Sequence, residues 1–285
     1  MCVWRKKKLN NKKMQLAATP YLLWMVIFVI VPLALIVVFA FTTTVKVDAN
    51  GNRLDDEAIA ALTEEYAGRG EEPPISEKTV FTFENILSVS KYTPTLLNSI
   101  WLAVIATVIC LLIGYPLAYI ISRTNYSRQK IMIMLVMLPM WMNFLLRTYA
   151  WMTLLERNGL INKFFGLFGI GPFEMINTSG AVVLGMVYNY LPFMILPLYS
   201  IMTKIEKHTI EAAQDLGANA FQVLMRVVVP LSVPGIASGI TMVFVPSVST
   251  FIISRMLGGG TNMLIGDLID LQFLGNAYNP NLGAA

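Results

Sequence analysis

The chain has 285 residues, of which 56% are hydrophobic and 13% charged, about half the charged share of an ordinary soluble domain. This composition excludes a protein whose whole surface faces water and indicates a chain that lies largely in a membrane. The formal net charge is +4, but the charges are segregated along the chain, so we interpret them as marks of membrane orientation and expect no nucleic-acid partner. The two cysteines, Cys2 and Cys110, have neither disulfide nor metal-ligand spacing.

Residues 21–41 form the first transmembrane segment that the sequence predicts. This run contains no charged residue, and at about 1.5 Å per residue its length matches a hydrocarbon core of roughly 30 Å. A cleaved signal peptide has a shorter apolar core and a small-residue cleavage site, which residues 39–42 do not offer. The helix is therefore expected to remain in the membrane.

Further apolar segments, each long enough to span, lie at residues 97–121, 131–155, 179–202 and 231–253. The sequence thus predicts an all-α integral membrane protein with five transmembrane helices. Basic residues cluster in the tail 1–20 and in the links 122–130 and 203–226. The positive-inside rule places all three, and with them the N-terminus, in the cytoplasm.

The stretch from residue 42 to 93 then lies outside the membrane as a hydrophilic external loop. It holds ten acidic residues against five basic ones. Its central part, residues 48–74, contains several Gly and Pro residues around an Ala- and Glu-rich run, and it is expected to form a short helix between flexible links. No chemistry is assigned to it.

The link between the fourth and fifth apolar segments carries the most specific pattern in the chain. Residues 211–216 read Glu-Ala-Ala-Gln-Asp-Leu, a good helix former, with Glu211 near the start, where the helix dipole favours a carboxylate. Gly217 is predicted to end this helix in the left-handed conformation. Pro230 and Pro234 are predicted to break the next helix just before it enters the membrane.

These residues resemble the signature of the permease subunits of binding-protein-dependent ATP-binding-cassette (ABC) importers. That signature is Glu-Ala-Ala, three residues, Gly, nine residues, an aliphatic residue, one residue and Leu-Pro. The positions in register here are Glu211, Ala212, Ala213, Gly217, Val227 and Pro230, with Val229 in place of the leucine. The alternative is an ordinary connecting loop with a helical turn.

The resemblance runs from residue 21 to the end of the chain and implies a MetI-like, type I importer transmembrane domain. It implies a permease core over 94–285 with a coupling loop at 203–230. In that family the loop docks on an ATPase subunit. The docking residues it implies here are Glu211, Ala212, Ala213, Asp215, Gly217 and Pro230.

Residues 188–199, 257–266 and 270–274 further resemble the spermidine/putrescine branch of the family, in its first-subunit form. That branch continues into one more membrane helix, so the sixth helix is expected to be missing at the C-terminus. The resemblance implies polyamine import in the bacterial cytoplasmic membrane. The implied partners are a second permease subunit forming a heterodimer, two ABC ATPase subunits, an extracytoplasmic solute-binding protein and membrane lipid.

A phosphate-binding Gly-rich loop with its lysine does not occur in the sequence. ATP and Mg²⁺ are therefore expected in the partner ATPase, and this chain is expected to bind no cofactor or metal and to hold no catalytic residue. A membrane-embedded enzyme would need a nucleophile with its base or a metal cluster, and the chain has a single histidine.

Asn189, between Tyr188 and Tyr190, is the clearest candidate for the substrate path. Polar side chains are expensive at membrane depth, and Asn189 lies roughly 15 Å along the fourth segment, near the midplane. Aromatic rings around a polar centre suit an amine. An interhelical hydrogen bond that packs the helix explains the residue equally well.

Three charged residues near the outer side complete the candidates. Arg147 lies about 24 Å along the third segment and is predicted to snorkel and anchor the helix rather than to contact substrate. Asp267 and Asp270 are three residues apart, on one face of a predicted helix, where paired acids could attract a diamine. Outer-surface carboxylates commonly just face water.

Two other functions stay open at this point. The same importer class carries sugars, anions, metals and amino acids as well as polyamines. A secondary transporter working alone should show inverted repeats and buried ionisable pairs, which the sequence does not suggest.

Overall fold

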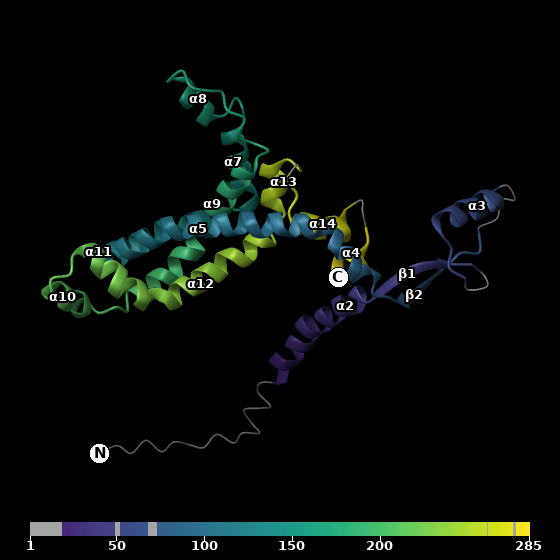
Figure 1. Cartoon of the computed structure of the whole chain (residues 1–285), viewed down its shortest axis with the longest axis horizontal. Helices are drawn as coiled ribbons and strands as arrows, with labels where there is room; N and C mark the ends of the chain where they lie inside the picture. Colours follow the sequence, from purple (N-terminus) through teal and green to yellow (C-terminus); the bar gives the residue numbers. More distant parts are fainter. Residues whose placement is uncertain (1–18, 49–51, 68–72, 261, 276–277) are drawn as a thin grey trace, which may run out of the picture. The chain divides into compact units, whose positions relative to one another are not determined.

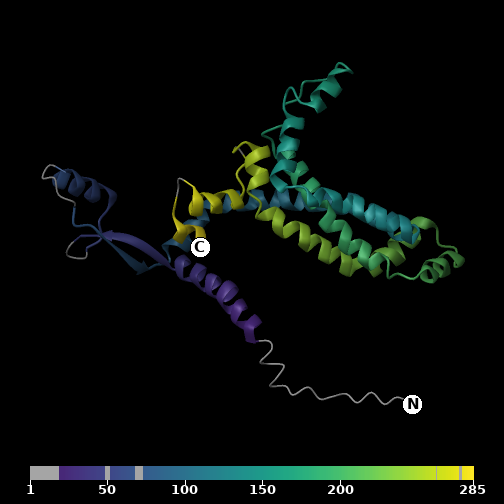
Figure 2. The same ribbon diagram turned by 180° about the vertical axis from the view of Figure 1, so that it is seen from behind.

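The computed structural model describes residues 19–48, 52–67, 73–260, 262–275 and 278–285. The chain forms two compact units. The first consists of residues 1–92 with 271–285, and the second of residues 93–270. Figures 1 and 2 show the elements of both.

The first unit begins with a helix over residues 19–40, in which a π-helical turn, η1 (Val26–Ile30), leads into α2 (Val31–Ala40). Strand β1 (Thr42–Val47) follows and pairs antiparallel with β2 (Ser76–Phe81), in a register that sets Thr42 opposite Phe81. Between them lies α3 (Asp56–Ala67), which confirms the short helix predicted within 48–74. The strands were not predicted, although β-branched residues fill β1.

The rest of the first unit closes around the end of α2. Helix α4 (Glu84–Val89) and η2 (Ser90–Tyr92) follow β2, and α15 (Pro280–Ala284) packs against α2 and α4. The buried Asn85 amide donates to the carbonyl oxygens of Thr42, at 2.8 Å, and of Ala40, at 3.4 Å. These bonds fasten the start of α4 to the backbone where α2 passes into β1.

The core of the second unit consists of α5 (Thr93–Arg123), α9 (Ser179–Met202) and α12 (Val229–Val248), packed against one another (Figure 1). The side chains of Met186, Met194 and Leu198 on α9 are fully enclosed. Small residues let the helices approach: a Cβ added at Gly239 on α12 would lie 2.7 Å from the sulfur of Met194. Such close contacts are how membrane helices associate without a hydrophobic driving force between them.

The segment predicted as one span over 131–155 is not a straight helix. It consists of α6 (Tyr126–Met137), η3 (Leu138–Trp141) and α7 (Phe144–Leu155), and α8 (Leu160–Gly166) follows. The axis turns by 89° at the break. Asn143 caps α7, since its side-chain oxygen accepts from the Leu145 N–H at 2.8 Å. Figure 2 shows α7 and α8 directed away from the bundle of α5, α9 and α12.

Residues 220–248 form one continuous helical span, so the break predicted at Pro230 and Pro234 is wrong. Helix α11 (Ala220–Val223) passes through a π-helical turn, η4 (Leu224–Val228), into α12. Proline lacks an N–H and clashes with the carbonyl four residues back, and the wider π-turn just before it relieves this clash. The same arrangement, η1 before Pro32, occurs in the first helix.

The described residues thus contain four long apolar helices, and the predicted five if the bent pair forms one span. After α12 the second unit continues in α13 (Ile252–Gly258), which packs on α9 and α7, and in most of α14 (Ile265–Leu274). The structure is mainly helical, as the sequence predicted.

Candidate functional site

The coupling loop predicted from the sequence forms α10 (Lys207–Asp215), at the opposite end of the second unit from α13 (Figure 1). Glu211, Ala212 and Asp215 lie exposed on this helix, and Ala213 is half-buried. Gly217 has a φ of +86° and its N–H donates to the Gln214 carbonyl at 2.8 Å. The predicted left-handed end of the helix is confirmed.

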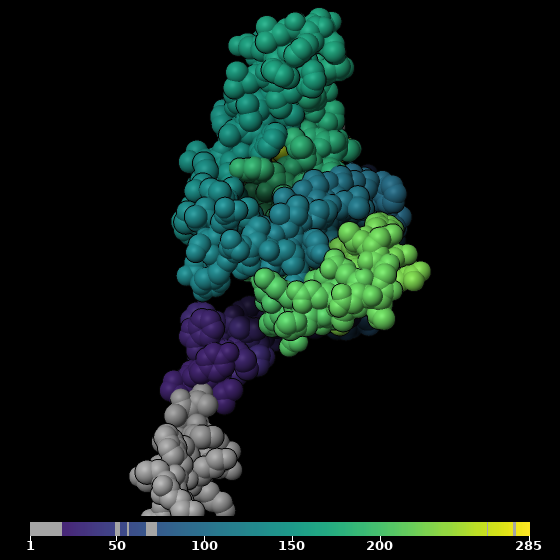
Figure 3. All heavy atoms as spheres, turned by 90° about the vertical axis from the view of Figure 1, so that its left-hand side faces the viewer, coloured from purple at the N-terminus to yellow at the C-terminus, as the bar shows by residue number. Residues whose placement is uncertain are grey.

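A small apolar cluster below α10 holds the helix in place. It consists of the buried side chains of Ile205, Val223 and Val228, against which Ile210 and Ala213 pack. In Figure 3, which faces this end of the second unit, the green atoms of the region form a continuous exposed surface. The helix is therefore both fixed and accessible.

Arg123, at the end of α5, ties this end to the membrane helices. Its guanidinium donates to the carbonyl oxygens of Ile205, at 3.2 Å, and of Met202, at 3.4 Å. A cation at the C-terminus of α9 also interacts favourably with the helix dipole. Hydrogen bonds thus connect the end of α5 to the end of α9 and to the residues that lead into α10.

The three path candidates on α9 have different surroundings. Asn189 is 2% exposed; its amide donates to the Gly185 carbonyl of its own helix at 2.8 Å, and its side-chain oxygen has no hydrogen-bond partner among the described residues. The Tyr190 hydroxyl donates to the Pro246 carbonyl of α12 at 3.4 Å. Tyr188 packs edge-on against Trp151 of α7, with ring centroids 5.3 Å apart. The three side chains thus contact three different helices.

Arg147, in the first turns of α7, is 7% exposed, so the predicted snorkelling to the outer interface is wrong. Its guanidinium lies over the Phe144 ring, 5.8 Å from the centroid. After the break the helix axis is turned by 89°, and Arg147 is buried within the chain. In the sequence, that turn is marked by Pro139 and the capping Asn143.

Asp267 and Asp270 lie on one helix, α14, as predicted, but each is engaged within the chain. Asp267 is 4% exposed and accepts a hydrogen bond from the Leu264 N–H at 2.9 Å. Burial raises the pKa of its carboxyl, and hydrogen bonds from Ser254 and from the Leu264 backbone partly offset this. Asp270 forms an ion pair with Arg255 of α13 at 2.6 Å.

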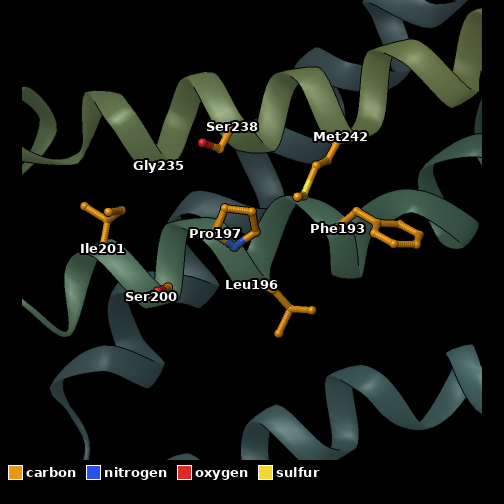
Figure 4. A pocket seen from close by; sticks show the side chains of 8 residues that line it. All are labelled: Phe193, Leu196, Pro197, Ser200, Ile201, Gly235, Ser238 and Met242. Carbon is orange, nitrogen blue, oxygen red and sulfur yellow. The ribbon is translucent and has the colours of Figure 1, made fainter. Parts of the chain in front are cut away.

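An open groove of about 510 Å³ lies between α9 and α12 (Figure 4). Its lining is apolar apart from the hydroxyl groups of Ser200 and Ser238. The lining residues are Phe193, Leu196, Pro197, Ser200 and Ile201 on α9, with Gly235, Ser238 and Met242 on α12. Sequence reasoning missed this groove, although the three- and four-residue spacing of these positions on each helix is a signal that could have found it.

The comparisons with known proteins agree with this geometry. Residues 82–281 match the model of the family described as binding-protein-dependent transport system inner membrane component. The chain belongs to this family. The permease assignment made from the Glu-Ala-Ala loop is thereby confirmed. This permease is a transport subunit of the importer class that works with a solute-binding protein and an ATPase, and it passes through the membrane several times.

Two relatives are similar to this permease over most of their length. It is 36% identical over 270 residues to the spermidine/putrescine transport system permease protein PotB of Haemophilus influenzae, covering 94% of this chain and 86% of the relative. It is 38% identical over 212 residues to PotB of Escherichia coli, covering 73% and 77%.

The fold is shared with a bacterial alginate ABC transporter solved in complex with its alginate-bound periplasmic protein. The TM-score is 0.65 with 16% sequence identity, over 96% of this permease and 88% of that chain. At this identity the likeness concerns the fold alone.

The permease also exposes large apolar residues near α10 that sequence reasoning did not single out. Leu216 is 89% exposed, Phe221 67% and Met225 47%. Large apolar side chains that face water together are typical of a protein–protein contact. The signal of the first two in the sequence is the pair of apolar residues on either side of Gly217.

Proposed function

We propose that this permease forms, together with a second permease subunit, the translocation path of an ATP-driven importer for polyamines such as spermidine and putrescine. The observation that carries the substrate is the identity of 36–38% to two polyamine permeases over most of each chain. The importer class itself follows from the family. A sugar, anion, metal or amino acid as substrate is the alternative within this class.

The coupling step rests on α10 with Gly217 and the surface around it. A short helix on a packed base transmits a rigid-body push that a flexible loop would absorb. Glu211, Asp215 and Leu216 are exposed there and available to an ATPase subunit. ATP and Mg²⁺ would bind in two such ATPase subunits. Pro230 would act indirectly, because it lies in the first turn of α12, directly after the π-turn η4.

The orientation follows from the positive-inside rule. The basic tail 1–20 and the coupling loop 203–230 would face the cytoplasm, and the loop 42–93 would face outward, within reach of a solute-binding protein. The core 94–285 would carry the path. The membrane would be the cytoplasmic membrane of a bacterium.

The path would run along α9. Tyr188, Asn189 and Tyr190 would lie near the midplane, and the groove with Ser200 and Ser238 lies two to three turns further along α9, toward α10. Neutral hydroxyl, amide and aromatic groups can hold an amine without binding it too tightly to release. Asp267 and Asp270 are engaged internally, so the outer acidic loop would concentrate cations without selecting them.

The substrate is tested by uptake of radiolabelled spermidine in cells that hold the partner subunits. Tyr190→Ala should reduce polyamine uptake more than it reduces assembly of the complex. Tyr126→Ala is the control, since Tyr126 is 71% exposed at the start of α6. Cells that import a sugar or an anion but no polyamine would contradict the substrate and leave the importer class intact.

The orientation is tested by labelling single cysteines in a Cys2→Ser, Cys110→Ala background. Ser76→Cys on β2 and Thr209→Cys on α10 place exposed thiols on the hairpin and the coupling helix. A membrane-impermeant maleimide should label the first in intact cells and the second only after lysis. Labelling of both from outside would contradict the orientation.

A further inference from the structure

Arg147 is a buried cation that forms no ion pair with the residues that the structure describes. It is 7% exposed, and its Nε and Nη1 atoms are enclosed without a hydrogen-bond partner among the described residues. In the part of the second unit that the structure describes, the ion pairs join His208 to Glu211 and Arg255 to Asp270, and none includes Arg147. A buried, unpaired charge is strongly unfavourable, so the working protein needs an anion here.

The backbone around Arg147 adds positive potential rather than offsetting it. Arg147 is the fourth residue of α7, and the guanidinium lies over the Phe144 ring, back toward the helix N-terminus. The amide dipoles at a helix N-terminus favour an anion and disfavour a cation. Broken membrane helices use such ends to hold anionic groups. The side chain and the helix end therefore call for the same kind of partner.

A protein carboxylate suits this site better than a lipid phosphate, because the site is enclosed by the chain. Arg147 is 7% exposed, and Phe144, whose ring lies against the guanidinium, packs on the hydrophobic core of the second unit. The substrate does not serve either, because a polyamine is a cation.

We propose that Arg147 is the cationic half of an ion pair whose carboxylate comes from the second permease subunit, at the break between η3 and α7. The proposal rests on the heterodimer proposed above. Of the three guanidinium nitrogens, Nε and Nη1 are enclosed without a hydrogen-bond partner among the described residues, and Nη2 does not belong to this group. The carboxylate would bind at Nη2. The pair would fix the register of the two subunits beside Phe144 and keep a free cation out of a path for polyamines.

The test uses the whole importer, with all subunits co-expressed and this chain tagged. The readout is the amount of second permease that co-purifies in mild detergent. Arg147→Glu should lower it tenfold or more, because two carboxylates then meet, and Arg147→Lys should stay within about threefold of the unaltered chain. Arg157→Glu makes the same charge change at an exposed position ten residues away and should have no effect.

A second arm separates an ion pair from misfolding of the variant. Each Asp and Glu in the membrane segments of the second permease is changed to Lys in turn and combined with Arg147→Glu. One of these changes should restore at least half of the co-purification, which only charge complementarity can do. Co-purification of Arg147→Glu at the unaltered level would overturn the proposal, and so would a loss that no change in the partner restores. A loss that instead varies with the fraction of anionic lipid added to the detergent would also overturn it, in favour of a lipid headgroup.

The outcome is distinguishable from failure of the proposed function. Co-purification of the unaltered chain with a second permease is the baseline, and its absence would contradict the heterodimer. Loss of spermidine uptake with an intact subunit pair would contradict only the substrate.

Discussion

The two polar ends of the second unit carry the same kind of residue in opposite situations. At the end that carries α10, Glu211 and Asp215 lie exposed, and Glu211 pairs with the exposed His208 at 3.1 Å. At the other end, Asp267 is buried and Asp270 is paired with Arg255. Carboxylates on short helices are thus available to a partner at one end and used to hold helices together at the other.

The largest effect should come from Gly217→Val, compared with Gly260→Val at the opposite end. Both glycines have positive φ, +86° and +77°, with open space around the position of a Cβ, so a β-branched side chain strains both backbones alike. Only Gly217 shapes the coupling surface. Substrate-stimulated ATP hydrolysis in the reconstituted importer should fall tenfold or more for Gly217→Val and change little for Gly260→Val. Equal loss for both would contradict the difference between the ends.

Asp267→Ala should have the next largest effect, on stability rather than on coupling. It leaves the buried Leu264 N–H without its acceptor, which costs about 1–3 kcal/mol of the free energy of unfolding. Thermal unfolding of the purified protein in detergent measures this. Asp267→Asn keeps an acceptor oxygen and should lose less. An unchanged melting temperature for Asp267→Ala would show that the acid is not structural.

The pH dependence of the same unfolding transition sharpens this comparison. Burial raises the pKa of Asp267 in the folded state, so the folded protein holds this proton more tightly than the unfolded chain. The resulting stability is complete below the unfolded pKa of roughly 3.9 and is lost as the pH rises through the folded pKa. Asp267→Asn does not titrate and should remove this part of the pH dependence.

Glu211→Lys should have a smaller effect on coupling than the glycine change. It reverses one exposed charge in the proposed contact with the ATPase and leaves the fold of α10 intact. Rim charges act mainly on association, so we expect about threefold weaker binding of the ATPase subunit, and less of a difference at high salt. The control is Glu156→Lys, at an exposed position after α7. Binding curves that coincide for both variants would exclude Glu211 from the contact.

The smallest effect should come from Asp270→Asn, which removes the ion pair with Arg255. The Arg255 side chain is 51% exposed and that of Asp270 16%, and because one partner faces water we expect a contribution of no more than about 1 kcal/mol. Thermal unfolding at low and high salt should show a small loss at low salt that shrinks as salt rises. A loss as large as that of Asp267→Ala would mean that Asp270 is more deeply engaged than its neighbour.

The sequence by itself determined the class of this protein. Composition and run length predicted the apolar helices, because the thickness of the membrane sets a length that can be counted. The pattern from Glu211 to Pro230 identified the family, and Gly217 ended α10 as predicted, because a left-handed terminator is a local property of the backbone. These features need no knowledge of distant contacts.

The tertiary structure alone decided how the polar groups are used. The break before α7 and the π-turn before Pro230 depend on which backbone groups find partners, so the sequence did not predict the bend within 131–155, and the break predicted at Pro230 was wrong. Whether Arg147 snorkels, or Asp270 faces water, depends on how the surrounding segments enclose the one and on Arg255 of α13 for the other. Burial and ion pairing are properties of contacts between distant segments, and residue spacing within one helix does not contain them.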